Sequence, residues 1–211
     1  MYKIDLHVHT SHSGDNDAEP EEVIIEAIKR GLDGLVFTEH YYYGASEYAE
    51  RLAERYRGRI TVMRGVEFSA AEGHCLVFGA DTDRLGLKRP SVTELTYAVG
   101  RAGGVVIPSH PYRGGSGIGD LVYSAPGIIA LEGCNGCNLH AMNEMAISAA
   151  KILGVPYTGG SDAHSPQDVG GCYTEFESPV TPENFIELLR GGRYTGRDDC
   201  KISKGATAPS Y

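Results

Sequence analysis

The sequence predicts an α/β fold in which a largely parallel sheet is open or closed into a barrel. Segments with strand-like and helix-like patterns alternate along the chain, which favours a parallel sheet. Histidine and carboxylate residues follow several separate predicted strands, and in a barrel the carboxyl ends of the strands meet at one rim. The chain has 211 residues, fewer than the roughly 250 of a typical eight-fold barrel, so we expect a trimmed or distorted barrel.

The predicted elements of the first half alternate between strand and helix with one exception. Pro20 suits the first turn of a helix, and Gly31 ends that helix. The segment between Glu67 and His74 is too short for a crossover helix, so the flanking strands are expected to form an antiparallel hairpin. The expected elements are strand 3–8, helix 20–30, strand 34–38, helix 46–57, strands 60–66 and 74–79, and helix 92–102.

The second half is predicted to continue this alternation. The expected elements are strand 104–108, strand 127–132, helix 139–153, strand 156–160 and helix 182–190. The sequence contains no internal repeat and no low-complexity linker. We therefore expect one domain over residues 1–204, followed by a frayed tail at residues 205–211.

Six of the eight histidines lie in short phrases at the start or end of predicted strands. His7 and His9 are two residues apart on a strand, so their side chains point to one face and can bind one ion together. Asp5 shares this face and is placed to orient an imidazole. Asp162 and His164 repeat the spacing in a glycine-rich turn. Half-buried histidines with hydrogen-bond partners explain either pair equally well when it is taken alone.

Three further phrases carry the same residue types. Glu67 follows an apolar run, where an unpaired carboxylate would be unfavourable, so a bridging metal ligand fits there. His40 and His110 each end an apolar strand. Because separate structural explanations would have to hold for every phrase at once, we interpret the set as a multinuclear metal site. Imidazole and carboxylate ligands suit Zn, Mn and Fe alike.

The composition indicates a soluble protein. Hydrophobic residues make up 41% and charged residues 22% of the chain, and no stretch reaches the roughly 20 apolar residues that span a membrane. The sequence starts without the apolar region of a secretory signal, and its five cysteines lack the spacing of a disulfide framework. We expect a cytoplasmic location, and we interpret the Cys134 and Cys137 pair as apolar packing rather than a redox or zinc pair.

The net charge of −9 argues against broad binding of nucleic acid through a basic face. Bound divalent ions would nevertheless concentrate positive charge at one place. An acidic protein of this kind can therefore still present a cationic pocket to a phosphate group.

The histidine and carboxylate phrases resemble, in order and spacing, the motifs of the PHP (polymerase and histidinol phosphatase) family over about residues 1–195. The phrases are Asp5-Leu6-His7-Val8-His9-Thr10, Thr38-Glu39-His40, Gly65-Val66-Glu67, Gly73-His74, Ser109-His110-Pro111 and Ser161-Asp162-Ala163-His164. The resemblance implies a distorted seven-stranded β/α barrel with a trinuclear metal site at the carboxyl-terminal rim of the strands. It also implies hydrolysis of phosphate esters.

The resemblance further implies a ligand set for two or three divalent ions of Zn, Mn or Fe. The ligands are His7, His9, Glu67 and Asp162 for the first ion, Glu67, His74 and His110 for the second, and His40 and His164 for the third. The loop after His9 would supply one more ligand to the third ion. This sequence offers Asp15 or His12 there, and we favour Asp15.

The predicted chemistry uses water as the nucleophile. Two divalent ions bridged by one ligand lower the pKa of water towards about 7 and neutralise charge on a phosphoryl group. We predict Glu67, Asp162 and His164 as catalytic residues of this reaction.

Three more residues are candidates for substrate binding. Arg113 lies in a glycine-rich loop just after His110, and a guanidinium can bind phosphate oxygens in a bidentate manner. A solvated loop arginine is a slightly better explanation of this residue taken alone. Glu132 and Asn135 resemble another family phrase at the rim, and they are predicted either to contact the substrate or to support the site.

We therefore predict a metal-dependent phosphoesterase acting on a small phosphorylated metabolite or nucleotide. Alternatives are a 3′-5′ exonuclease acting on single-stranded oligonucleotides, a hydrolase of C–N bonds and a non-catalytic interaction module. The chain has no basic stripe that would bind duplex nucleic acid, none of its lysines ends a predicted strand, and no motif position is missing. The sequence leaves the substrate and the oligomeric state open.

Overall fold

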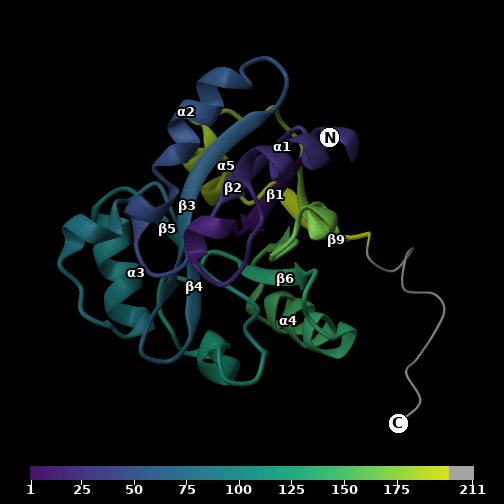
Figure 1. Ribbon diagram of the computed structural model, residues 1–211. Coiled ribbons are helices and arrows are strands. Elements are labelled where there is room, and N and C mark those ends of the chain that lie inside the picture. Colours follow the sequence, from purple (N-terminus) through teal and green to yellow (C-terminus); the bar gives the residue numbers. More distant parts are fainter. Residues whose placement is uncertain (200–211) are drawn as a thin grey trace, which may run out of the picture.

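The computed structural model describes residues 1–199, and its central feature is a curled, mixed sheet of seven strands (Figure 1). The strand order is β5-β4-β3-β2-β1-β8-β9. The strands are β1 (Tyr2–Val8), β2 (Gly34–Phe37), β3 (Thr61–Ser69), β4 (His74–Phe78), β5 (Val105–Pro108), β8 (Cys172–Phe176) and β9 (Tyr194–Asp198). The predicted tail at residues 205–211, and the domain end at residue 204, lie outside the described residues.

Only the centre of this sheet is parallel. Strands β1, β2 and β3 pair in parallel, whereas β3, β4 and β5 pair antiparallel, which confirms the predicted hairpin. Strands β8 and β9 add two antiparallel strands beside β1. The expectation of a largely parallel sheet without strands after residue 160 was therefore wrong. Each of these two strands is five residues long and mixes polar with apolar residues, so neither shows a continuous apolar run.

A second sheet of two parallel strands, β6 (Leu131–Asn135) and β7 (Tyr157–Gly160), lies across the open side of the curled sheet. Strand β6 contacts β5 and β9, and β7 contacts β1, β8 and β9. The strand predicted at residues 127–132 was placed too early in the sequence, because β6 begins at Leu131 and continues through Gly133 to Asn135. Glu132 consequently lies inside the strand and not at its end.

The helices are α1 (Pro20–Lys29), α2 (Tyr48–Arg55), α3 (Val92–Arg101), α4 (His140–Leu153) and α5 (Phe185–Gly191). Helices α1, α2 and α3 cover the outer face of the curled sheet, as the α/β prediction requires, and α4 packs on β6. Helix α5 instead packs on the inner face, where Phe185 and Leu189 join Met63 and Leu76 in one buried cluster. The apolar stripe of α1, including Val23 and Ile24, joins Leu35 and Phe37 of β2 in one buried cluster. No helix within residues 1–199 combines the length and the apolar character needed to cross a membrane.

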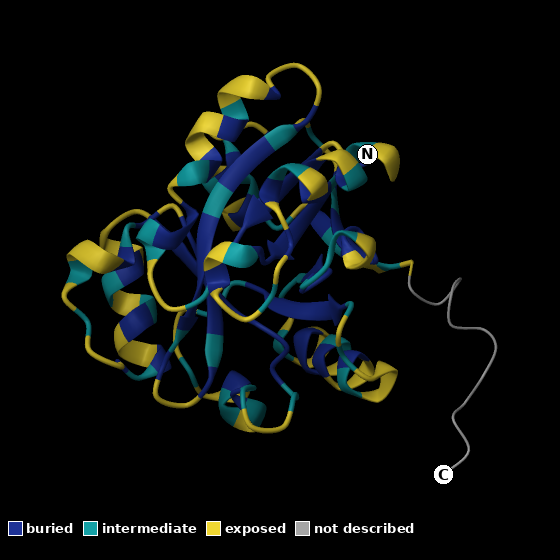
Figure 2. Ribbon diagram, viewed as in Figure 1, coloured by how far each residue is buried: buried dark blue, intermediate teal, exposed yellow. Residues whose placement is uncertain are grey.

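Burial follows the layers of the fold (Figure 2). The strands are largely buried, and the outward faces of the helices are exposed. The predicted α/β class with a distorted, curled sheet is confirmed. Unusually for a core, many polar side chains are buried as well, and they gather where β1, β3, β5 and β7 end.

A glycine sets the distance between the two sheets at this polar region. A Cβ atom on Gly160 of β7 would lie 2.4 Å from Cβ of His7 and 2.8 Å from its backbone nitrogen. Real side chains do not tolerate such a contact, so only glycine allows β7 to approach β1 this closely.

Gly160→Ala is therefore expected to destabilise the protein by about 1–3 kcal/mol through overpacking. Gly100→Ala is the matched control, because Gly100 lies in α3 with no atom within 4 Å of the added Cβ. Alanine in an exposed helix should stabilise the protein by up to about 1 kcal/mol. Urea unfolding of both variants measures the difference. Equal stability of Gly160→Ala and the wild type would contradict the close approach of β7 to β1.

Candidate metal centre

Most predicted ligands come from the ends of five strands, while His74 begins β4 and Asp15 lies in the loop before α1, and all of them meet in one cluster. His7 is in β1, His40 follows β2, Glu67 is in β3, His110 follows β5, and Asp162 follows β7. Within residues 1–199, three groups have ligand atoms that all lie within 4.8 Å of one another. The groups are His7, His9, Glu67 and Asp162; Glu67, His74 and His110; and His9, His40 and His164.

The first group is completely buried. The Nε2 atoms of His7 and His9 are 2.9 Å apart, and each lies 3.4 Å from Oε2 of Glu67 and 3.3 Å from Oδ1 of Asp162. Two carboxylates and two imidazoles thus direct one atom each towards a common point. This donor set and its convergence fit a divalent cation such as Zn²⁺.

The electrostatics of the group show how strongly it attracts positive charge. Burial opposes ionisation, but the charges of Asp162, Glu132 and Glu67 hold the pKa of His7 well above its usual range. Burial likewise disfavours the ionised carboxylates, yet the nearby His7 holds the pKa values of Glu67 and Asp162 well below their usual ranges. Without a metal ion, protons on the imidazoles balance the acids.

Glu67 divides its two oxygen atoms between two groups. Its Oε2 faces His7 and His9, whereas its Oε1 lies 2.8 Å from Nε2 of His110 and 3.3 Å from Nδ1 of His74. A carboxylate that presents one oxygen to each of two imidazole groups has the arrangement of a bridging ligand.

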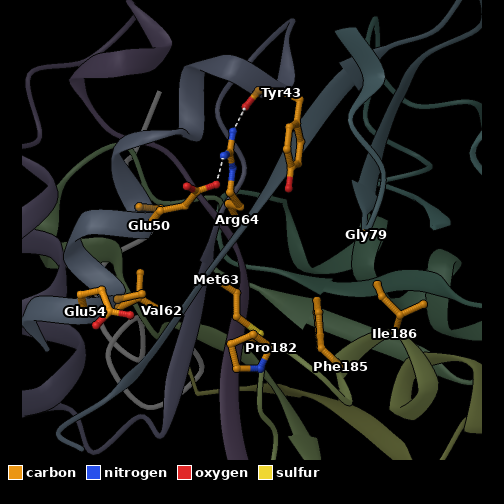
Figure 3. Close-up of a pocket in the computed structure, with 12 residues that line it drawn as sticks. Tyr43, Glu50, Glu54, Val62, Met63, Arg64, Gly79, Pro182, Phe185 and Ile186 are labelled. Atoms are coloured by element: carbon orange, nitrogen blue, oxygen red, sulfur yellow. Dashed lines mark hydrogen bonds and ion pairs between the residues drawn. The ribbon is translucent and has the colours of Figure 1, made fainter. Parts of the chain in front are cut away.

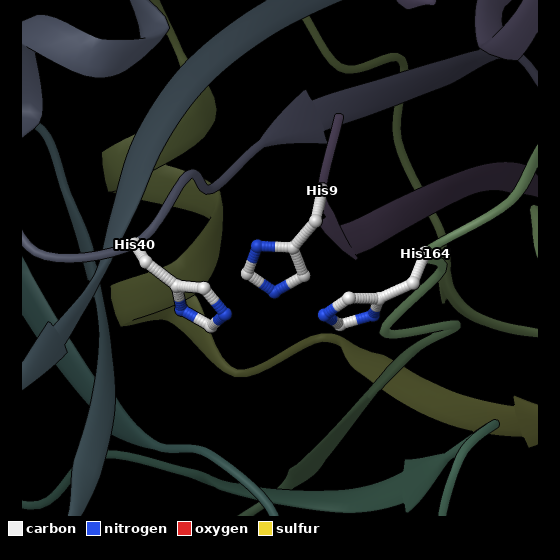
Figure 4. Close-up of side chains that lie close together, drawn as sticks. All are labelled: His9, His40 and His164. Atoms are coloured by element: carbon white, nitrogen blue, oxygen red, sulfur yellow. The ribbon is translucent and has the colours of Figure 1, made fainter. Parts of the chain in front are cut away.

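The third group is less buried than the first, because His40 and His164 are partly exposed. The rings of His9, His40 and His164 are turned towards one another (Figure 4). Oδ2 of Asp15 lies 3.0 Å from Nε2 of His40 and 3.1 Å from Nε2 of His164. His12 instead stacks on the ring of Tyr48, with the ring centroids 4.1 Å apart. The geometry therefore favours Asp15 over His12 as the loop ligand.

Two histidines have their ring orientation fixed by acceptors behind them. Nδ1 of His7 lies 2.8 Å from Oε1 of Glu132, and Nδ1 of His164 lies 2.9 Å from the carbonyl oxygen of Asp162. A carboxylate and a carbonyl can only accept, so each Nδ1 carries the hydrogen. The Nε2 lone pairs of both rings then face the cluster, which is the usual state of a metal-binding histidine.

Backbone strain is concentrated at the same place. Four residues other than glycine have positive φ angles within residues 1–199, and His110 (31°) and Asp162 (53°) are two of them. Tyr41 (73°) directly follows His40, and Arg89 (47°) is the one member away from the cluster. Strained residues of this kind persist where the surroundings hold them firmly, which is typical of functional sites.

The predicted substrate contacts form a network beside Asp162. Glu132 has no exposed surface and lies behind His7, and its Oε2 accepts hydrogen bonds from the backbone of His110 and from Asn135. Nη1 of Arg113 lies 2.8 Å from Oδ2 of Asp162, and the guanidinium also donates to Asn135. These positions favour a supporting role for Glu132.

Sequence reasoning missed several members of this network. Asn138 accepts from Arg113, and Asn143 holds the backbone of Asn135, but neither lies in a motif phrase. Cys134 is buried as expected, whereas Cys137 is exposed and its thiol donates to the carbonyl oxygen of Asp162. The packing interpretation was therefore wrong for Cys137, because the turn after β6 carries it to the rim.

A separate pocket of about 350 Å³ lies between α2, β3 and α5 (Figure 3). Met63, Phe185 and Ile186 form its apolar side. Arg64 borders it and is held by Glu50 and by the carbonyl oxygen of Tyr43. None of the predicted metal ligands lines this pocket, so it is distinct from the cluster.

Comparison with family models identifies two matching regions. The model described as "PHP domain" matches residues 5–107, and the one described as "PHP-associated" matches residues 140–194. Among curated proteins, a histidinol-phosphatase from Lactococcus lactis subsp. lactis (strain IL1403) is 34% identical over 59 residues. That match covers 27% of this chain and only 22% of the length of that protein.

Solved structures share the fold over nearly the whole chain. PsfC from Pseudomonas syringae PB-5123 superposes with a TM-score of 0.72 and 23% identity over 93% of this chain and 91% of that one. A proposed metal-dependent phosphoesterase from Bifidobacterium adolescentis ATCC 15703 gives a TM-score of 0.65 and 20% identity over 90% and 96%. An amidohydrolase from Chromobacterium violaceum gives 0.63 and 20% over 94% and 99%. At these identities the likeness establishes the fold.

Binding of Zn²⁺ to the metal-free protein is expected to release protons. Burial lowers the pKa of His9, but hydrogen bonds with Asp162 and Glu67 raise it to about 9, so the ring is charged at pH 7.5. A histidine must be neutral to bind a metal ion. Calorimetric titration in buffers of different ionisation enthalpy should therefore show the release of about one proton or more per ion.

The same pKa shift predicts how pH affects the metal-free fold. Because the folded value of about 9 exceeds the usual 6.5, the charged His9 ring stabilises the fold fully below pH 6.5. That contribution is lost as the pH rises through about 9. His140→Ala is the control for the loss of an imidazole outside the cluster, since His140 lies on the surface of α4 and its ion-pair partner Glu144 is 3.6 Å away.

In the zinc titration, binding without proton release would contradict the ligand assignment of His9.

Proposed function

The chain belongs to the PHP family, and on this premise we propose that it is a metal-dependent phosphoesterase acting on a small phosphorylated metabolite or nucleotide. The observation that carries the proposal is the division of Glu67 between two groups of imidazoles. A pair of bridged ions is the arrangement that activates water and neutralises charge in phosphate-ester hydrolysis. The proposed ligands for two or three ions of Zn, Mn or Fe are those of the three groups, with Asp15 completing the third.

Glu67, Asp162 and His164 are the proposed catalytic residues. Glu67 and Asp162 are buried and supply negative charge at the point where the imidazoles converge, which fixes the position of the ions. The side chain of His164 is 36% exposed, so it lies at the side from which a substrate arrives. When bound, the ions would act as Lewis acids that activate water and stabilise charge on the phosphoryl oxygens.

Arg113 is the proposed phosphate contact. A guanidinium has five N–H donors, and Arg113 commits one each to Asp162, Asn135 and Asn138. The remaining donors are free to bind oxyanions, and the side chain is 26% exposed beside Asp162. Because its other contacts hold it in place, little side-chain entropy is lost when a phosphate binds.

The substrate class follows from the open side of the cluster and from the charge of the chain. Local likeness to a histidinol-phosphatase supports a phosphomonoester of a small metabolite.

The alternative functions are less well supported. A net charge of −9 disfavours tracking along an oligonucleotide, so a 3′-5′ exonuclease is the weaker alternative. A non-catalytic interaction module would not need such a set of converging, buried acids and imidazoles. Hydrolysis of a C–N bond lacks the strand-end lysine that would accompany it. Among the described lysines, Lys3 lies near the start of β1, Lys29 and Lys151 lie in helices, and Lys88 lies in the loop before α3.

A phosphate-release screen tests this proposal. Protein loaded with Zn²⁺ or Mn²⁺ is expected to release phosphate from at least one member of a panel of sugar, amino-alcohol and nucleotide phosphates. Asp162→Ala should reduce the rate by about 100-fold or more, because it removes a ligand and the partner of Arg113. Release of phosphate at the same rate by wild type and variant would show that a contaminant is responsible, and short oligonucleotides in the panel test the exonuclease alternative.

The loop ligand is tested by metal content. Asp15→Asn is expected to lower the zinc content by about one ion per chain, because Asp15 contacts both His40 and His164. Asp17→Asn is the matched control in the same loop, since Asp17 is exposed and belongs to none of the metal groups. His12→Gln should also keep the full content. Loss of an ion from His12→Gln but not from Asp15→Asn would reverse the assignment.

A further inference from the structure

Glu39 is a buried carboxylate that belongs to none of the three metal groups. It has no exposed surface, and it lies in the chain between Thr38 and His40. Its Oε1 accepts hydrogen bonds from the hydroxyl groups of Thr10, at 2.7 Å, and Tyr48. Its Oε2 accepts from the backbone of Thr10, at 3.1 Å, and from the hydroxyl of Ser13. All four donors are uncharged groups, so these contacts of Glu39 are hydrogen bonds and not ion pairs.

These contacts dictate the direction of the hydrogen bond from Ser13. An ionised carboxylate can only accept, so the Ser13 hydroxyl must donate its single hydrogen to Glu39. One lone pair of Ser13 accepts the backbone N–H of His40 at 3.2 Å. The other faces Nδ1 of His9 at 3.0 Å. Since Ser13 has no hydrogen left to donate, Nδ1 of His9 must carry one.

The consequence reaches the first metal group. With its hydrogen on Nδ1, a neutral His9 presents the lone pair of Nε2 to Glu67 and Asp162. His7 reaches the same state through direct contact with Glu132. His9 reaches it through one intervening hydroxyl group.

We propose that Glu39 is a positioning residue which acts through Ser13 to select the metal-binding tautomer of His9. The inference rests on the proposed metal-dependent function, because it concerns a ligand of the proposed ions. A purely structural role would not require an acceptor at Oε2. The backbone N–H of Thr10 can only donate to this position, so an amide of the same shape would place its oxygen there and keep the hydrogen bond from Ser13. A side chain without an acceptor would instead allow the Ser13 hydroxyl to turn towards His9. His9 would then carry its hydrogen on Nε2, where it blocks the ion.

The test compares three variants by zinc titration and by ¹⁵N NMR of the histidine rings in zinc-loaded protein. Glu39→Ala and Ser13→Ala are expected to weaken zinc binding by about 10–100-fold, in the range measured for residues that orient metal ligands. In wild type the His9 ring should show a protonated Nδ1 and a zinc-bound Nε2. In Glu39→Ala this signature should be lost or mixed with the other tautomer.

Tyr48→Phe is the matched control for packing. It also removes a hydroxyl donor from Glu39, but from Oε1, and so leaves Ser13 on Oε2 undisturbed. It should lower stability while zinc affinity stays within about two-fold of wild type. Ser13→Ala serves the comparison if Glu39→Ala does not fold.

Wild-type zinc affinity and an unchanged His9 signature in the variants would overturn the inference and leave the phosphoesterase proposal intact. A wild-type protein that does not bind zinc would overturn both. Neither readout uses a substrate, so an inactive panel in the phosphate screen has no bearing on the role of Glu39.

Discussion

Buried negative charge is the constraint on which this structure depends. Glu67 and Asp162 retain almost no exposed surface, and carboxylates placed so deeply must be balanced by positive charge at hydrogen-bond distance. The imidazoles of His7 and His9 provide that balance as cations when no metal is present. A divalent ion provides it when the rings are neutral. The fold therefore creates a site that attracts cations, and the sheet holds the acids and the imidazole rings together.

The scaffold meets this constraint by tying β1 to the loop after β7. Asp5 is fully buried and accepts backbone hydrogen bonds from Ser161 and Gly170, each at 2.8 Å, and from His7 at 3.3 Å. Burial raises the pKa of Asp5 to about 6 in spite of these bonds. Asp5 thus fixes the backbone on both sides of Asp162, and this explains how that residue is held at a positive φ angle.

Features that depend on neighbouring residues could be predicted well from the sequence, whereas features that depend on contacts between distant residues could not. The spacing of His7 and His9, and the short gap from Glu67 to His74, follow from the geometry of a strand and a hairpin, so both were predictable. Strand β8 pairs with the edge of β1 and β9 pairs with β8, and no local sequence pattern reveals either pairing. The link from Glu39 through Ser13 to His9 joins residues up to 30 positions apart in the chain and depends on hydroxyl directions. Only a structure can supply those directions.

Exposure divides the cluster into an inner and an outer part, and the division determines how a substrate can approach. The side chains of His7, His9 and Glu67 are at most 1% exposed, whereas those of Asp15 and His164 are 41% and 36% exposed. A phosphate group too large to enter the inner part can still reach its edge from this outer side. Glu67 and Asp162 are therefore shielded from water, whereas Asp15 and His164 are not. This separation allows strong electrostatics inside, where the dielectric constant is low, without closing the site to a ligand.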